Sequence, residues 1–109
     1  MTLAQAVAQG RSAEVTFDGT VATAPRFVTS RSGAHERFFV RSDDGVYVRI
    51  ADNVSIADPC PVEPGDRVEI KGEFTRSYAD GSPLVHWTHH DPSGRHADGF
   101  IEFDGRRYA

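Results

Sequence analysis

The sequence lacks the features that would assign it to a disulfide-bonded, zinc-ribbon or membrane class. Its 109 residues include one cysteine, Cys60, so neither an intramolecular disulfide nor a cysteine-based zinc ribbon can form. No apolar run approaches the roughly 18 residues that a membrane span needs. The first ten residues have no basic segment and are interrupted by glutamine, which makes a poor export signal. We therefore expect a cytoplasmic protein with no membrane partner.

An excess of positive charge and the common catalytic motifs are also missing. Twelve Lys and Arg against sixteen Asp and Glu leave a formal net charge of −4, which disfavours sequence-blind binding of duplex DNA. The sequence contains no Gly-x-Gly-x-x-Gly or Walker pattern, and Cys60 lies between two prolines with nothing to activate its thiol. Hydrophobic residues at 39 % and charged residues at 26 % are typical of one globular domain. These absences favour a binding protein over an enzyme.

The hydrophobic periodicity predicts a mostly β chain with one short helix. Thr2 as N-cap and Gly10 as terminator indicate a helix within residues 1–10. Alternating apolar and polar residues then predict five strands and a final β-hairpin. We expect the strands at residues 14–21, 37–41, 46–50, 67–74 and 84–89, and the hairpin at residues 100–103 and 106–108. Residues 23–33 are expected to form a loop, and the proline-rich segment 53–66 at most a turn of helix.

Five short strands with glycine inside two of them predict a small barrel. Gly19 and Gly72 suit positions where a sheet bends sharply. We expect an all-β fold, a five-stranded barrel of the oligonucleotide/oligosaccharide-binding (OB) type over residues 11–109, preceded by the helix and ended by the hairpin. An SH3-like barrel is the alternative.

Histidine is concentrated in one block. Four of the five histidines fall within eleven residues; the set is His35, His86, His89, His90 and His96. In a regular strand over residues 84–90, His86 and His90 would share one face about 13 Å apart, too far to chelate one ion. If the strand ends near Thr88, the later members of the block and Asp91 could converge across the turn at residues 92–94.

Three interpretations of this block are open. The side chains can brace the C-terminal hairpin, line a site for a non-metal ligand, or bind a divalent transition metal such as zinc, and only the last requires a cofactor. The candidate metal ligands are His35, His86, His89, His90, Asp91 and His96. A metal-bound water beside a histidine base would make the protein a metal-dependent hydrolase or nuclease.

A second feature is a basic segment with interleaved aromatic residues. Residues 26–41 contain four arginines, three phenylalanines and a single glutamate, and Tyr47 and Arg49 follow on the next strand. In an OB barrel the second and third strands form the usual ligand face. Arginines for phosphates and exposed aromatic rings for bases are what single-stranded nucleic acid requires. Adjacent strand residues point to opposite faces, so at least one of Phe38 and Phe39 can be exposed.

Several blocks of the sequence resemble a small bacterial family, the domain of unknown function 3465. The most distinctive is Val-His-Trp-Thr-His-His-Asp-Pro at residues 85–92, and others are His-Glu-Arg-Phe at 35–38, Gly-Asp-Arg-Val at 65–68 and Gly-Glu-Phe at 72–74. The sequence departs at Asp52, where the family tends to have His, and at Phe100, where it tends to have Trp; some relatives also begin with an export segment. The resemblance implies a compact β domain with a shared histidine-rich block and transfers no activity.

Together these patterns predict a small soluble binding module with a polar site. The expected site residues are His35, Arg37, Phe39, Tyr47, Arg49, His86, Trp87, His89, Asp91 and His96. The expected ligand is single-stranded nucleic acid or another anionic ligand. Metal binding, and a structural domain that contacts a protein partner, are the alternatives.

Overall fold

Alternating buried and exposed residues give this chain its strands. The computed structural model describes all 109 residues. The elements are α1 (Leu3–Gln9), β1 (Ala13–Val21), β2 (Arg26–Ser30), β3 (Gly33–Ser42), β4 (Tyr47–Asn53), β5 (Arg67–Arg76), β6 (Pro83–His86), β7 (Phe100–Phe103) and β8 (Arg106–Tyr108). The helix α1 lacks the length and apolar character needed to cross a lipid bilayer, and the chain has no other helix.

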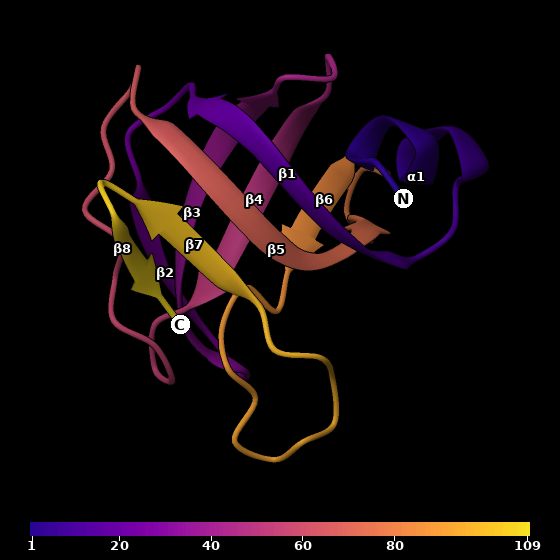
Figure 1. Ribbon diagram of the computed structural model, residues 1–109. Helices are drawn as coiled ribbons and strands as arrows, with labels where there is room; N and C mark the ends of the chain where they lie inside the picture. Colours follow the sequence, from indigo (N-terminus) through magenta and orange to yellow (C-terminus); the bar gives the residue numbers. More distant parts are fainter.

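Five strands close into a barrel in the order β1-β3-β4-β6-β5, with β5 pairing back to β1 (Figure 1). Every pair in the ring is antiparallel except β4 with β6, which is parallel. Outside the ring, β2 pairs with β3, and the β7–β8 hairpin extends the sheet from β5. The predicted small all-β barrel of five strands, with an N-terminal helix and a C-terminal hairpin, is confirmed.

The predicted boundaries are wrong in two places that matter for the site. Residues 26–30 form strand β2 instead of lying in a loop, and β3 begins at Gly33. All five residues of β2 are exposed, so no hydrophobic alternation marks the strand, which is held by backbone pairing to β3. Strand β6 ends at His86 and does not reach residue 89, because Trp87 has a left-handed backbone with φ 55°.

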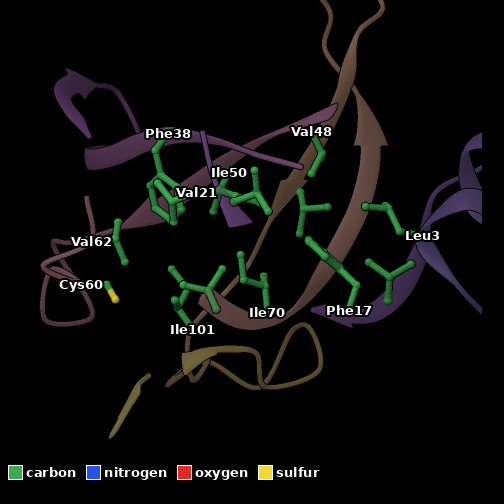
Figure 2. Packing of buried hydrophobic residues seen from close by; sticks show 14 of the residues in the cluster. Leu3, Phe17, Val21, Phe38, Val48, Ile50, Cys60, Val62, Ile70 and Ile101 are labelled. Atoms are coloured by element: carbon green, nitrogen blue, oxygen red, sulfur yellow. The ribbon is translucent and has the colours of Figure 1, made fainter. Parts of the chain in front are cut away.

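The barrel interior is filled by the inward residues of the strands and is closed at its ends by other segments. Leu3 and Ala6 of α1 are fully buried at one end, and Cys60 and Val62 of the proline-rich segment lie at the opposite side of the core (Figure 2). Thr2 forms a capping box with Gln5, as expected for the N-cap. Burial raises the pKa of the Cys60 thiol to about 12, so the thiol is protonated at neutral pH.

Gly72 lets the end of β6 approach β5 closely. A Cβ atom on this residue would lie 2.5 Å from the carbonyl oxygen of His86 and 2.9 Å from side-chain atoms of Val85 and Thr88. The backbone carbonyl cannot move away as a flexible side chain would. Glycine at this position therefore brings the histidine-rich block down onto the barrel.

Two carboxyl groups face the barrel interior. Glu36 on β3 and Asp52 on β4 are directly opposite each other in the sheet register and are 1 % and 0 % exposed. One oxygen of Glu36 accepts a hydrogen bond from the Cys60 N–H at 2.9 Å, and Asp52 Oδ1 accepts one from the Thr88 hydroxyl at 2.9 Å. Asp52 Oδ2 has no partner. Desolvation raises the pKa of Glu36 to about 7 and that of Asp52 to about 6.

We expect Glu36→Gln to stabilise the protein at pH 8 and to have little effect at pH 5. The folded pKa of Glu36 lies above its ordinary value, so the folded carboxyl keeps a proton that the unfolded chain has already released. The fold therefore loses stability as pH rises from the ordinary range of the carboxyl through 7. The neutral amide removes this loss, and the gain at pH 8 should be roughly 1–2 kcal/mol after the cost of an unpaired amide N–H. Urea unfolding at both pH values measures it.

The control for this substitution is Glu63→Gln at an exposed position of the proline-rich segment. It should leave the difference between the two pH values unchanged. Equal destabilisation by Glu36→Gln at pH 5 and pH 8 would contradict the assignment of a proton to the buried carboxyl.

Candidate functional site

A cavity of about 500 Å³ lies on the outer side of the barrel, where β3, β4 and β6 meet the loop between β6 and β7. We call it the histidine cavity. It is lined mainly by His35, Arg37, Asn53, His86, Trp87, His89, Asp91, Ser93, Arg95 and His96. Seven of the ten predicted site residues are among these. The other three, Phe39, Tyr47 and Arg49, lie elsewhere on the same outer face.

Strand register accounts for the residues that the barrel itself contributes. On β3, His35 and Arg37 alternate with the inward Glu36 and Phe38, so both point to the outer face. His86 is the last residue of β6 and is half-buried on that face. Three residues far apart in the sequence are thus placed around one opening by ordinary alternation.

Trp87 organises the part of the block that follows β6. Its ring stacks between two imidazoles, with centroid separations of 4.5 Å to His86 and 4.4 Å to His96, and both pairs are nearly parallel. His89 meets His96 edge-on at 5.3 Å. An extended strand would send His86 and Trp87 to opposite faces. The left-handed backbone at Trp87 instead brings its ring onto the ring of His86.

Asp91 holds the turn that carries His96. Its Oδ1 accepts hydrogen bonds from the N–H of Ser93 at 2.9 Å and from the Ser93 hydroxyl at 2.7 Å. Its Oδ2 accepts from the N–H groups of Arg95 and His96 at 2.6 and 2.9 Å. These donors hold the pKa of the Asp91 carboxyl well below its usual range. Asp91 lines the cavity, but both of its oxygens are already engaged by the turn.

Three of the imidazoles are oriented by backbone carbonyls. The Nδ1 atoms of His35, His89 and His96 lie 3.2, 2.7 and 2.8 Å from the carbonyl oxygens of Gly33, His90 and Ala97. A carbonyl oxygen can only accept, so Nδ1 carries a proton in each ring, and Nε2 of the neutral form is an acceptor. Burial lowers the pKa of His35 and of His86, and the charges of neighbouring residues lower both further. These two rings are neutral at pH 7.

The rings do not form a chelating group. No three or more His, Cys, Asp or Glu side chains in the chain are placed to hold one metal ion. His90 lies outside the cavity, where its exposed ring bonds through Nδ1 to Asp98 at 2.9 Å. Of the remaining imidazoles, His86 and His96 stack on Trp87, and His35, His89 and His96 have Nδ1 on a carbonyl oxygen.

The outer face of β3 and β4 carries a stack of arginine and aromatic side chains. Phe39 and Tyr47 stack with centroids 4.8 Å apart. The Arg49 guanidinium lies over Phe39 at 5.3 Å, and the Arg41 guanidinium lies over Tyr47 at 4.8 Å. Sequence reasoning placed three of these residues in the site but missed Arg41, which the alternation of β3 puts on the same face.

Beside this stack lies a second hollow of about 490 Å³, which we call the arginine groove. It is lined by Thr23, Ala24, Arg26, Val28, Arg37, Phe38, Phe39 and Arg49. Arg26 and Arg37 are directly opposite each other in the β2–β3 register. Arg37 also lines the histidine cavity, so it joins the two hollows. Sequence reasoning missed Arg26 as a site residue because residues 23–33 were expected to form a loop.

Comparison with known families agrees with the blocks noted in the sequence. A family model described as a protein of unknown function (DUF3465) matches residues 1–109, the whole chain. The chain belongs to the DUF3465 family. The resemblance predicted from the sequence is therefore confirmed. No curated protein and no solved structure matches this DUF3465 chain.

We expect Asp91→Ala to lower the melting temperature and to change the fluorescence of Trp87, the only tryptophan. The substitution removes the acceptor that holds the turn, so His96 should leave the ring of Trp87. Because the folded pKa of Asp91 is lowered, its stabilising effect is present above the ordinary carboxyl range and is lost on acidification. Thermal unfolding monitored by Trp87 emission tests both effects.

Asp58→Ala is the control, because Asp58 forms an exposed ion pair with Arg106 at 3.2 Å. Such pairs contribute little to stability. An Asp91→Ala protein with the emission spectrum and melting temperature of this control would contradict the assigned role.

Proposed function

We propose that this protein binds single-stranded nucleic acid along the arginine groove and the outer face of β3 and β4. The main observation behind the proposal is that the acidic side chains of β3 and β4 point away from the outer face. Glu36 and Asp52 are the only acidic residues of these two strands, and both point into the barrel. The outer face of β3 and β4 therefore presents only neutral and basic groups to a ligand.

The arginines of this region are free to bind phosphate. All five arginines between residues 26 and 49 lack a hydrogen bond or ion pair to another residue. By contrast, Arg67, Arg76, Arg106 and Arg107 each donate to an oxygen elsewhere in the protein. Free guanidinium N–H groups match the geometry of phosphate oxygens. The facing pair Arg26 and Arg37 repel each other, and an anion between them would relieve that repulsion.

Aromatic surface for base stacking surrounds the same face. Tyr47 on β4 is 41 % exposed, and Tyr78 in the loop after β5 is fully exposed and lines a hollow with Arg37 and Arg49. Base-aromatic stacking is worth about 1–3 kcal/mol per base and tolerates any sequence. The contacts of Arg41 and Arg49 with aromatic rings are worth about 0.5–1 kcal/mol at exposed sites. A guanidinium can therefore leave its ring for a phosphate and free the ring for a base.

Strand order supports an OB-type arrangement of this face. β1 pairs with both β3 and β5, and the ring contains a single parallel pair. The ligand face of an OB barrel lies on its second and third strands, flanked by the loops after the first and fourth. In this chain these are β3, β4, the segment around β2 and the loop at residues 77–82, which carries Tyr78.

The net negative charge is compatible with this proposal because it is concentrated elsewhere. The acidic residues of β1, β5 and β7 are Glu14, Asp18, Glu69, Glu73 and Glu102. A single strand that follows the groove stays on the basic face of β3 and β4, where Asp80 in the flanking loop is the nearby carboxylate. A duplex, which presents many phosphates over a wide surface, would also meet the acidic strands.

We expect Phe39→Ala to weaken binding of a short fluorescent oligonucleotide by roughly 5- to 150-fold, the equivalent of losing one stacked base. Arg49→Ala should weaken binding and lower the slope of affinity against salt concentration by about 0.7. Fluorescence anisotropy at several salt concentrations measures both.

Arg107→Ala is the matched control, because the Arg107 guanidinium lies 4.0 Å over the ring of Phe100 on the β7–β8 hairpin. It removes one positive charge from an arginine–phenylalanine pair outside the proposed face. No binding by the unaltered protein at low salt would refute the proposal. So would an equal loss of affinity in Arg107→Ala and Arg49→Ala.

A further inference from the structure

The histidine cavity continues the basic face at the side of β3 nearest the loop after β6. Arg37 belongs to both hollows, and its buried Nε has no hydrogen-bond partner in the protein. A buried polar group without a partner costs free energy unless a ligand satisfies it. The Arg37 guanidinium thus has no protein acceptor that an anionic ligand would have to displace.

The imidazoles that line the cavity also have unused nitrogens. The Nε2 atoms of His35 and His89 have no protein partner, and neither ring nitrogen of His86 has one. The one acidic residue of the lining, Asp91, already accepts four hydrogen bonds from its own turn. A ligand in the cavity thus meets a guanidinium and several imidazoles without a free carboxylate to oppose it.

We propose that the histidine cavity binds a phosphate monoester, with Arg37 and the imidazoles of His35, His86 and His89 as its hydrogen-bond donors. A monoester has two negative charges and three terminal oxygens, whereas the internal diester of a nucleic acid has one charge and two such oxygens. The cavity has enough hydrogen-bond donors for the three terminal oxygens of a monoester. The inference rests on the proposed function, because the monoester is taken to be the phosphorylated end of the bound strand.

Binding in this cavity takes up protons. In its neutral form His35 has its proton on Nδ1, so Nε2 must gain one before it can donate to a phosphate oxygen. The charged and titratable groups that face the cavity are Arg37 and His35 from β3, His86 from β6, and His89, Asp91, Arg95 and His96 from the loop. Glu73 of β5 is directly opposite His86 in the sheet register, but it lines an adjoining hollow and not the cavity. The phosphate dianion supplies the negative charge that favours protonated imidazoles among these cations. Affinity should therefore fall as pH rises from 7 to 8.5, a range in which the charge of the monoester is nearly constant.

The test compares one oligonucleotide sequence in three forms, with a 5′-phosphate, with a 3′-phosphate and with neither, beside inorganic phosphate alone. We expect at least one phosphorylated form to bind about tenfold more tightly than the unphosphorylated form at pH 7, with a smaller advantage at pH 8.5. Titration calorimetry in buffers of different ionisation enthalpy should detect proton uptake. Trp87 emission reports occupancy of the cavity, because its ring stacks on His86 and His96.

His86→Gln should abolish the phosphate-dependent advantage and leave binding of the unphosphorylated strand unchanged, because His86 is on β6, outside the proposed strand-binding face. His35→Gln should also lose the phosphate-dependent advantage, and His90→Gln is the matched control, because His90 lies outside the cavity. Melting temperatures of the three variants separate loss of the site from loss of the fold.

Equal affinity for all three oligonucleotides would overturn the monoester site and leave the proposed function standing. Loss of the phosphate-dependent advantage in His90→Gln as large as in His86→Gln would also overturn it. Binding of inorganic phosphate without binding of any unphosphorylated strand would support the cavity and refute the proposed function.

Discussion

Strict alternation along β3 and β4 is the constraint on which the rest of the molecule depends. It sends Phe38, Val40, Val48 and Ile50 into the barrel, and with the same period it sends Glu36 and Asp52 inward. The residues between them then form an outer face without acidic groups. A slip of one residue in either strand would exchange the two faces, and would bury arginine while exposing the core. One register thus sets both the stability of the barrel and the charge of its surface.

Keeping acidic groups off the outer face of β3 and β4 lowers the stability of the fold, because two carboxyl groups are buried instead. Desolvation makes each of them hold its proton more tightly than in water, and they are opposite neighbours in the sheet. The two hydrogen bonds that these carboxyl groups accept both come from segments outside the strands, from the Cys60 N–H and the Thr88 hydroxyl. Asp52 thereby ties the histidine-rich block to the barrel interior through Thr88, one residue after Trp87.

Much of the fold could be predicted because its signals are local. The hairpin turn at Asp104 and Gly105, with φ of 53° and 79°, follows from an Asp-Gly pair between alternating residues. Strand β2 could not be predicted in the same way, since no residue in it is buried and its pairing with β3 is a property of the backbone. The inward direction of Glu36 could have been inferred from its position two residues before Phe38 in an alternating strand. A charged residue is usually exposed, but here the alternation of the strand places the side chain inside the barrel.

The sequence predicted which residues belong to the candidate site better than it predicted how their side chains are arranged. The concentration of histidine along the chain was enough to predict His86, His89 and His96 as site residues. The alternation of β3 was enough to place His35 and Arg37 on one face. The left-handed backbone of Trp87 carries no sequence signal, because bulky residues rarely adopt it. That single turn converts a run of side chains on alternate faces into a stack of three rings. The turn also needs the close approach of residues 85–88 to Gly72, a tertiary contact that no local pattern encodes.

The parallel pairing of β4 with β6 has a consequence for how the molecule assembles. Strand β6 is four residues long and completes the ring by lying between β4 and β5, and its contacts with β4 join parts of the chain separated by more than thirty residues. Pairings of this kind pay a large loop-closure entropy and form slowly. The residues that follow β6 cannot take their places around Arg37 until the ring is complete. A nascent or partly unfolded chain therefore has its basic strands but no finished cavity, and its ligand would distinguish the mature protein from its folding intermediates.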